Sequence, residues 1–178
     1  ILPLTLLLFS FTLRIFLISK GPYHVDCLAL AINAQKTYTD HTLHYQFGTG
    51  YPLTVLAGTL FIGLTNFFSI NDPVFAVNLM SVWLSSLTVL IFFLLLKNTF
   101  NKLTAFLGAT ALSLHPIFLT LSVYGNSHVV SLFFFLLSLY FLTHSQIKYK
   151  NILFPLSLGL MGAARLQDMA LILIPTGI

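Results

Sequence analysis

The stretch VFAVNLMSVWLSSLTVLIFFLLL, residues Val74–Leu96, decides the fold class of this chain. It has no charged side chain, and it is longer than the roughly 20 apolar residues that a helix needs to cross a membrane. Other apolar runs lie on both sides of it: Ile1–Ser19, Pro52–Phe68, Leu103–Leu121, Val129–Thr143, Ile152–Ala164 and Met169–Ile178. The pattern predicts an all-α fold, a polytopic bundle of transmembrane helices.

The composition supports this class. Apolar residues make up 57% of the chain, charged residues make up only 7%, and eighteen residues are phenylalanine. A soluble domain of this length does not need so much apolar surface. The net charge of +4 comes from scattered residues, so we expect membrane lipids, and no nucleic acid, as partners. The single cysteine, Cys27, excludes an internal disulfide.

The ends of the sequence indicate a piece of a longer protein. The chain begins at Ile1 and stops at Ile178, in both cases inside an apolar run. The first run has no basic segment and no small-residue cleavage site, so it predicts a retained span and not a signal peptide. We therefore expect residues 1–178 to form one transmembrane module of a larger protein, and the fragment alone to be inactive.

The distribution of lysine predicts the orientation in the membrane. Basic residues gather in the short connections Lys97–Lys102 and Ser145–Asn151, and none occurs in Asn66–Pro73 or Ser122–His128. The positive-inside rule places the two basic connections in the cytoplasm. Two alternatives remain for Pro52–Phe68. If it spans the membrane, the polar segment before it is cytoplasmic, and if it lies along the interface, that segment is outside.

This polar segment, Lys20 to Tyr51, is the main candidate for chemistry. It contains three of the six histidines and two of the four aspartates. Within it, Asp26–Tyr38 has the spacing of a short helix with Asp26 near its N-terminus. An aspartate in that position can serve as a helix cap, and it can also act as a catalytic carboxylate. We interpret Asp26 as the leading candidate for the second role.

Charged and polar residues elsewhere form three further candidates. Arg14, near the end of the first span, could extend to the lipid headgroups or bind a lipid-linked phosphate. Arg165 and Asp168 interrupt an apolar run at i and i+3, where they could neutralise each other or serve a functional site. Asn126 and His128 follow the helix-breaking Pro116 and are expected at one membrane face.

A metal site is a weaker hypothesis. His24, Asp26, His41 and His44 lie in the polar segment, and the last two have a chelating i, i+3 spacing. Loop histidines are more often ordinary interfacial residues, so we expect no cofactor, with a divalent metal as the alternative.

Read in order, these residues resemble the N-terminal part of the GT-C superfamily of glycosyltransferases. Arg14, the segment His24-Val25-Asp26-Cys27 and the segment Gly50-Tyr51-Pro52-Leu53 match the superfamily pattern in order. Gly162-Ala163-Ala164-Arg165 is similar to a Gly/Ala-rich turn that ends in a basic residue. The nearest resemblance is to the dolichyl-phosphate-mannose–protein mannosyltransferases. The chain departs from the pattern at Asn126 and His128, where many members have a second acidic residue, and this departure puts a metal-assisted mechanism in doubt.

The resemblance implies a function and a topology. Residues 20–70 would form the first outer loop, with Pro52–Phe68 lying along the membrane face. The reaction would transfer a sugar from a polyprenyl-phosphate donor to an acceptor of unknown class at the extracytoplasmic face of the cell or endoplasmic reticulum membrane. Asp26 would be the base. Substrate would contact Arg14, His24, Tyr51, Asn126, His128 and Arg165. The alternatives are a transporter or lipid-handling protein without catalysis, and an inactive relative.

Overall fold

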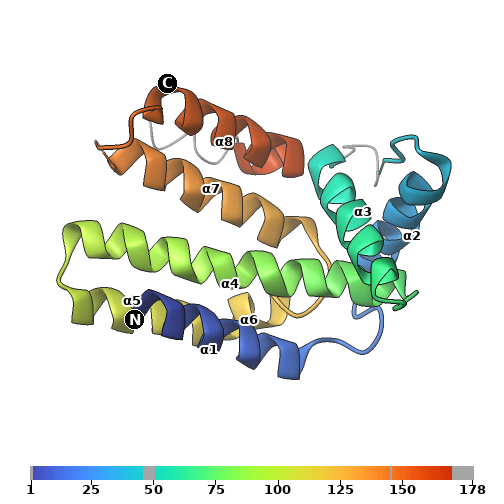
Figure 1. Cartoon of the computed structure of the whole chain (residues 1–178), viewed down its shortest axis with the longest axis horizontal. Coiled ribbons are helices and arrows are strands. Elements are labelled where there is room, and N and C mark those ends of the chain that lie inside the picture. Colours follow the sequence, from blue (N-terminus) through green and yellow to red (C-terminus); the bar gives the residue numbers. More distant parts are fainter. Residues whose placement is uncertain (1, 46–50, 145, 170–178) are drawn as a thin grey trace.

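The computed structural model describes residues 2–45, 51–144 and 146–169, and the described residues contain helices and no strand (Figure 1). The helices are α1 (Leu2–Leu17), α2 (Val25–Asp40), α3 (Pro52–Phe67), α4 (Pro73–Thr99), α5 (Lys102–Leu114), α6 (Pro116–Leu121), α7 (Ser127–Thr143) and α8 (Lys150–Ala164). The predicted all-α class is therefore confirmed over the described part of the chain. The predicted helix Asp26–Tyr38 is confirmed as α2, and most of the predicted run Met169–Ile178 lies outside the described residues.

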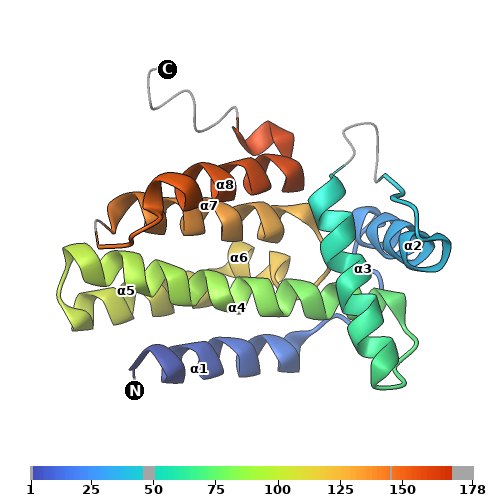
Figure 2. The ribbon, with the colours of Figure 1, turned by 45° about the horizontal axis from the view of Figure 1, so that its top comes forward.

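Helix α4 is the central element of the fold. It packs against α1 and α5 on one side and against α7 on the other, and α8 covers α7 (Figure 1). Helices α2 and α3 pack against each other and against α4, and α3 crosses the first half of α4 at a steep angle (Figure 2). One end of the molecule therefore consists of α2, α3 and the start of α4. The opposite end contains the connections α4–α5 and α7–α8.

The start of α4 has a clear cause in the sequence. The Asp72 side chain accepts hydrogen bonds from the backbone N–H groups of Val74 (2.9 Å) and Phe75 (3.1 Å), and Pro73 occupies the first helical position. Both features favour a helix start.

Within the described residues, α4 is the one helix long and apolar enough to cross a membrane, and α1, α3, α5 and α7 are shorter apolar helices. The multi-pass arrangement thus stays a prediction.

The predicted run Leu103–Leu121 is not one helix. It divides into α5 and α6 at His115–Pro116. Proline has no backbone N–H and its ring excludes the preceding helical turn, so α5 ends before it and α6 starts with Pro116 at its first position.

Two apolar clusters hold these helices together. The first joins α2, α3 and α4 with single residues of α7 and α8. Gly58 allows α3 to approach α2 and α4 closely, because a Cβ there would lie 3.1 Å from Ala34 and 3.2 Å from Val77. The second joins α1, α4, α5 and α6 around Phe93. The first cluster supports the end of the molecule where the candidate site residues lie.

Candidate functional site

Asp26 lies in the first turn of α2. His24 is the residue before the helix, and its Nδ1 accepts a hydrogen bond from the backbone N–H of Asp26 (3.3 Å). The same ring nitrogen lies 3.6 Å from Asp26 Oδ2. The capping group is thus His24, and the side chain of Asp26 is 49% exposed. A negative side chain in the first turn of a helix also interacts favourably with the helix dipole.

Asn126 has a structural function in the loop between α6 and α7. Its Nδ2 donates to the carbonyl oxygens of Leu121 (2.6 Å) and Tyr124 (2.8 Å), and its Oδ1 accepts from the N–H of Val129 (3.1 Å). The side chain is buried and is the N-cap of α7. Its hydrogen-bonding groups are therefore engaged in shaping the loop that leads to His128, the second residue of α7.

Arg165 follows the last residue of α8 and contacts His128. Its Nη1 donates toward the ring nitrogens of the His128 imidazole, and its Nε lies 3.2 Å from Asp168 Oδ1. The two members of the ion pair are 21% and 27% exposed. The two accounts of this pair, mutual neutralisation and a functional site, are thus compatible: Asp168 holds one side of the guanidinium while His128 contacts the other.

These residues come together with Asp26 at one end of the bundle. The charge of Asp26 acts on both Tyr124 and His128, and the Tyr124 ring lies 5.0 Å from that of Tyr23, three residues before Asp26. Burial, followed by the neighbouring Tyr23, Asp26 and Cys27, raises the pKa of Tyr124. We call the set Asp26, Tyr124, His128, Arg165 and Asp168 the polar cluster. It brings together residues from α2, the α6–α7 loop, α7 and the segment after α8.

Asn78 connects the segments that carry the polar cluster. This fully buried residue of α4 donates from Nδ2 to the carbonyl of Ser19 (3.0 Å). Its Oδ1 accepts from the N–H of Gly125 (2.8 Å) and from Sγ of Cys27 (3.2 Å). Asn78 is not among the predicted site residues, although a lone amide within an apolar span is a signal for a required hydrogen bond.

Tyr51 anchors the start of α3 beside Arg165. Its hydroxyl donates to Oε1 of Gln167 (3.0 Å), and Thr54 Oγ1 donates to the carbonyl of Ala164 (3.0 Å). Tyr51 also has a left-handed backbone, with φ at 43°, which few non-glycine residues adopt. These contacts place the predicted Tyr51-Pro52 motif next to the polar cluster.

Arg14 does not reach the polar cluster. It is fully buried, and its guanidinium donates to Oγ of Ser10 (2.6 Å) and Oγ of Ser113 (3.0 Å) and lies 5.1 Å from the Phe118 ring centroid. The side chain links α1, α5 and α6, and it does not extend to the lipid headgroups. Its predicted contact with a phosphate has no support in this geometry.

The residues proposed for a metal site are separated by the structure. His24 and Asp26 lie at the start of α2, whereas His41 caps its end and His44 Nε2 pairs with Asp40 Oδ2 (2.9 Å) at that same end. A helix of sixteen residues spans roughly 24 Å. Within the described residues, no group of three or more His, Cys, Asp or Glu side chains has an arrangement that could hold a metal ion. Each described pair offers at most two protein ligands, so a divalent ion held by either pair would need water or substrate oxygens at its remaining positions.

The family whose description is oligosaccharyl transferase STT3, N-terminal, matches residues 2–164. The chain belongs to this family. STT3 proteins are integral membrane glycosyltransferases of the GT-C superfamily, so the predicted superfamily is confirmed. The match gives no support to the narrower mannosyltransferase family, and it does not favour the transporter alternative. No curated protein and no solved structure matches the chain.

The match to STT3 covers Asp26 and His128 and ends one residue before Arg165. The polar cluster therefore extends from the matched region into the segment that follows it. The matched residues therefore include Asp26, the candidate base, but not Arg165, the cation of the polar cluster.

Proposed function

We propose that this chain is part of a membrane enzyme that transfers a saccharide from a polyprenyl-phosphate-linked donor to an acceptor at the extracytoplasmic face. The observation that carries the proposal is the half-exposed carboxylate of Asp26, in one cluster with Arg165 and His128. A lipid carrier would hold the donor at the membrane boundary, beside this end of the bundle. Residues 20–70, with α2 and α3, would be the first outer loop of a multi-pass module.

Asp26 would act as the general base. Its carboxylate would take the proton from the acceptor nucleophile as that atom forms a bond to C1 of the sugar. The bond between C1 and the phosphate oxygen would break, and its electron pair would leave with the phosphate. One carboxylate is sufficient for such a displacement, which inverts the configuration at C1. His24, beside Asp26, would contact the acceptor.

Arg165 would stabilise the leaving phosphate. A guanidinium forms paired hydrogen bonds with phosphate oxygens, and it stabilises negative charge as it develops on the leaving group. His128 and Asp168 contact this guanidinium from two sides and would keep it in position. Arg14, Tyr51 and Asn126 would support the site through the helices and loops that they fix.

The transferred group distinguishes two forms of the proposal. The family description names an oligosaccharyl group, for which we expect a lipid-linked oligosaccharide donor and a protein acceptor. The mannosyltransferase resemblance instead implies a single hexose on a lipid monophosphate. Both forms require Asp26 as the base and Arg165 as the cation. The decisive test is therefore a substitution of one of these residues, assayed with a lipid-linked oligosaccharide and with a lipid-monophosphate hexose.

The test compares Asp26→Asn with Asp40→Asn in the full-length protein. Both substitutions remove one carboxylate from α2, at opposite ends of the helix. Loss of a general base typically costs about 10²–10⁴-fold in rate, so we expect that loss for Asp26→Asn and transfer within about twofold of the original for Asp40→Asn. Near-normal transfer by Asp26→Asn, with either donor, would refute the assignment of the base.

A further inference from the structure

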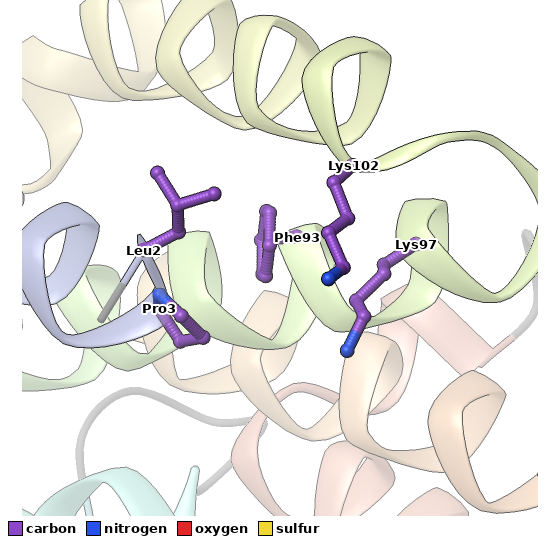
Figure 3. A pocket seen from close by; sticks show the side chains of 5 residues that line it. All are labelled: Leu2, Pro3, Phe93, Lys97 and Lys102. Carbon is purple, nitrogen blue, oxygen red and sulfur yellow. The ribbon is translucent and has the colours of Figure 1, made fainter.

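A cavity of about 430 Å³ lies at the end of the molecule opposite to the polar cluster, between α1, α4 and α5 (Figure 3). Its lining consists of Leu2, Pro3, Phe93, Lys97 and Lys102. Phe93 lies between the start of α1 and the two lysines, whose side chains extend in the same direction (Figure 3). The cavity thus combines an apolar floor with two amino groups at one edge.

None of the aspartates, all of which are among the described residues, lies close enough to neutralise these lysines. The sequence has four aspartates and no glutamate. Asp26 and Asp40 lie at the ends of α2, Asp72 caps the start of α4, and Asp168 follows α8. Lys97 is in the last turn of α4, whose 27 residues span roughly 40 Å. This separation is several times the Debye length of about 8 Å at physiological salt, so the aspartate nearest along the helix, Asp72, does not screen Lys97.

The start of α5 makes the Lys102 side of this edge more attractive to an anion, whereas the last turn of α4, which carries Lys97, has partial negative charge. Lys102 is the first residue of α5, where the helix dipole adds partial positive charge. Phe100 and Leu103, which are close in the sequence to the lining residue Lys102, are exposed apolar residues. A ligand that fits must therefore present a negative group to the lysines and an apolar part to the floor and its surroundings.

We propose that this cavity binds an anionic glycerophospholipid of the membrane leaflet at this end. The lipid phosphate would lie between the amino groups of Lys97 and Lys102, and the glycerol and the first part of an acyl chain would cover Leu2, Pro3 and Phe93. The positive-inside rule places this end in the cytoplasmic leaflet, which is the anionic leaflet of cell membranes. A free phosphate ion would engage the lysines and leave the apolar floor exposed to water.

The test measures phosphatidylglycerol bound to the full-length protein. Protein in nanodiscs of phosphatidylcholine with a small fraction of phosphatidylglycerol would be extracted gently, and the retained lipid would be counted by native mass spectrometry. The test variant is Lys97→Gln/Lys102→Gln. Lys148→Gln/Lys150→Gln is the matched control, because it removes the same charge from the same end of the bundle but outside the cavity lining. Lys97→Arg/Lys102→Arg keeps the charge and controls for folding.

We expect the Lys97→Gln/Lys102→Gln variant to bind phosphatidylglycerol roughly 30-fold more weakly, from the typical attraction of two lysines to an anionic surface. The control and the arginine variant should stay within about threefold of the original protein. Equal losses in the glutamine pair and its control would mean general surface attraction and would overturn the site. Release of the lipid by millimolar inorganic phosphate would assign the cavity to a soluble phosphate and overturn the lipid proposal.

Discussion

The substitution Asn78→Leu tests whether one buried amide holds the functional end together. Leucine has the same number of side-chain heavy atoms and the same branching as asparagine, so the change removes hydrogen bonds without opening a cavity. It deprives the Gly125 N–H and the Ser19 carbonyl of their partner, and it removes the acceptor for Cys27 Sγ. The three affected segments lead into α2 and α7, which carry Asp26 and His128.

The expected cost follows from these bonds. An N–H left without a partner in the interior costs about 1–3 kcal/mol, and a typical intramolecular hydrogen bond contributes about 0.5–1.5 kcal/mol net. Gly125 and Ser19 together therefore predict a loss of about 2–4 kcal/mol. For a domain of this size, 1 kcal/mol corresponds to about 2–4 °C in Tm, so the variant should melt about 5–15 °C lower. The matched control is Asn98→Leu, at the exposed far end of the same helix.

Cys27 provides a direct assay of the same event. It is fully buried and contacts Asn78, and burial raises the pKa of its thiol. In the full-length protein with other cysteines replaced, a thiol-reactive dye reports each opening of the start of α2. A loss of about 2–4 kcal/mol predicts about 30- to 700-fold faster labelling. Unchanged labelling and Tm in Asn78→Leu, relative to Asn98→Leu, would refute the reasoning.

Three further predictions concern packing and topology. Arg14→Lys should lower the Tm by several degrees, because lysine has one side-chain nitrogen and loses the bond from Arg14 Nη2 to the Ser113 carbonyl, worth about 1.5–3 kcal/mol for a charged donor. Its KM for the donor should stay unchanged, and a raised KM would support the predicted contact between Arg14 and a phosphate. Gly125→Ala should lower the free energy of unfolding, measured by thermal denaturation, by about 1–3 kcal/mol. The added Cβ would lie 2.6 Å from a Val77 methyl and 3.2 Å from the Val77 backbone. Val25→Cys with Cys27→Ala should react with an impermeant maleimide in intact cells, because Val25 is 72% exposed; labelling only after permeabilisation would place Asp26 in the cytoplasm.

The sequence predicted the elements that local chemistry determines. The apolar run around α4, the short helix at Asp26 and the helix break at Pro116 all depend on neighbours within a few positions, through periodicity and helix-breaking residues. The order of these motifs was also sufficient to predict the GT-C superfamily, which the family match confirms at that level.

The sequence did not predict contacts between distant segments. Arg14 had two plausible positions in a span, and its partner Ser113 lies 99 residues away. Hydropathy cannot show that α1 turns this arginine inward toward α5. The alternative of a metal site rested on nearness in the sequence, which placed four residues in one loop. The intervening helix α2 separates them into two pairs.

The same reasoning changes how the missing acidic residue should be interpreted. Asn126 donates two hydrogen bonds from its amide nitrogen to the carbonyls of Leu121 and Tyr124. An ionised aspartate has no donor to replace them, and it would face both carbonyls with negative charge. Position 126 in this chain is thus occupied by the residue that the loop requires. The second carboxylate of the polar cluster comes from Asp168, which the predicted pattern did not include. The Arg165 guanidinium, between His128 and Asp168, provides positive charge at this face. The absence of an acidic residue at position 126 therefore does not by itself indicate an inactive protein.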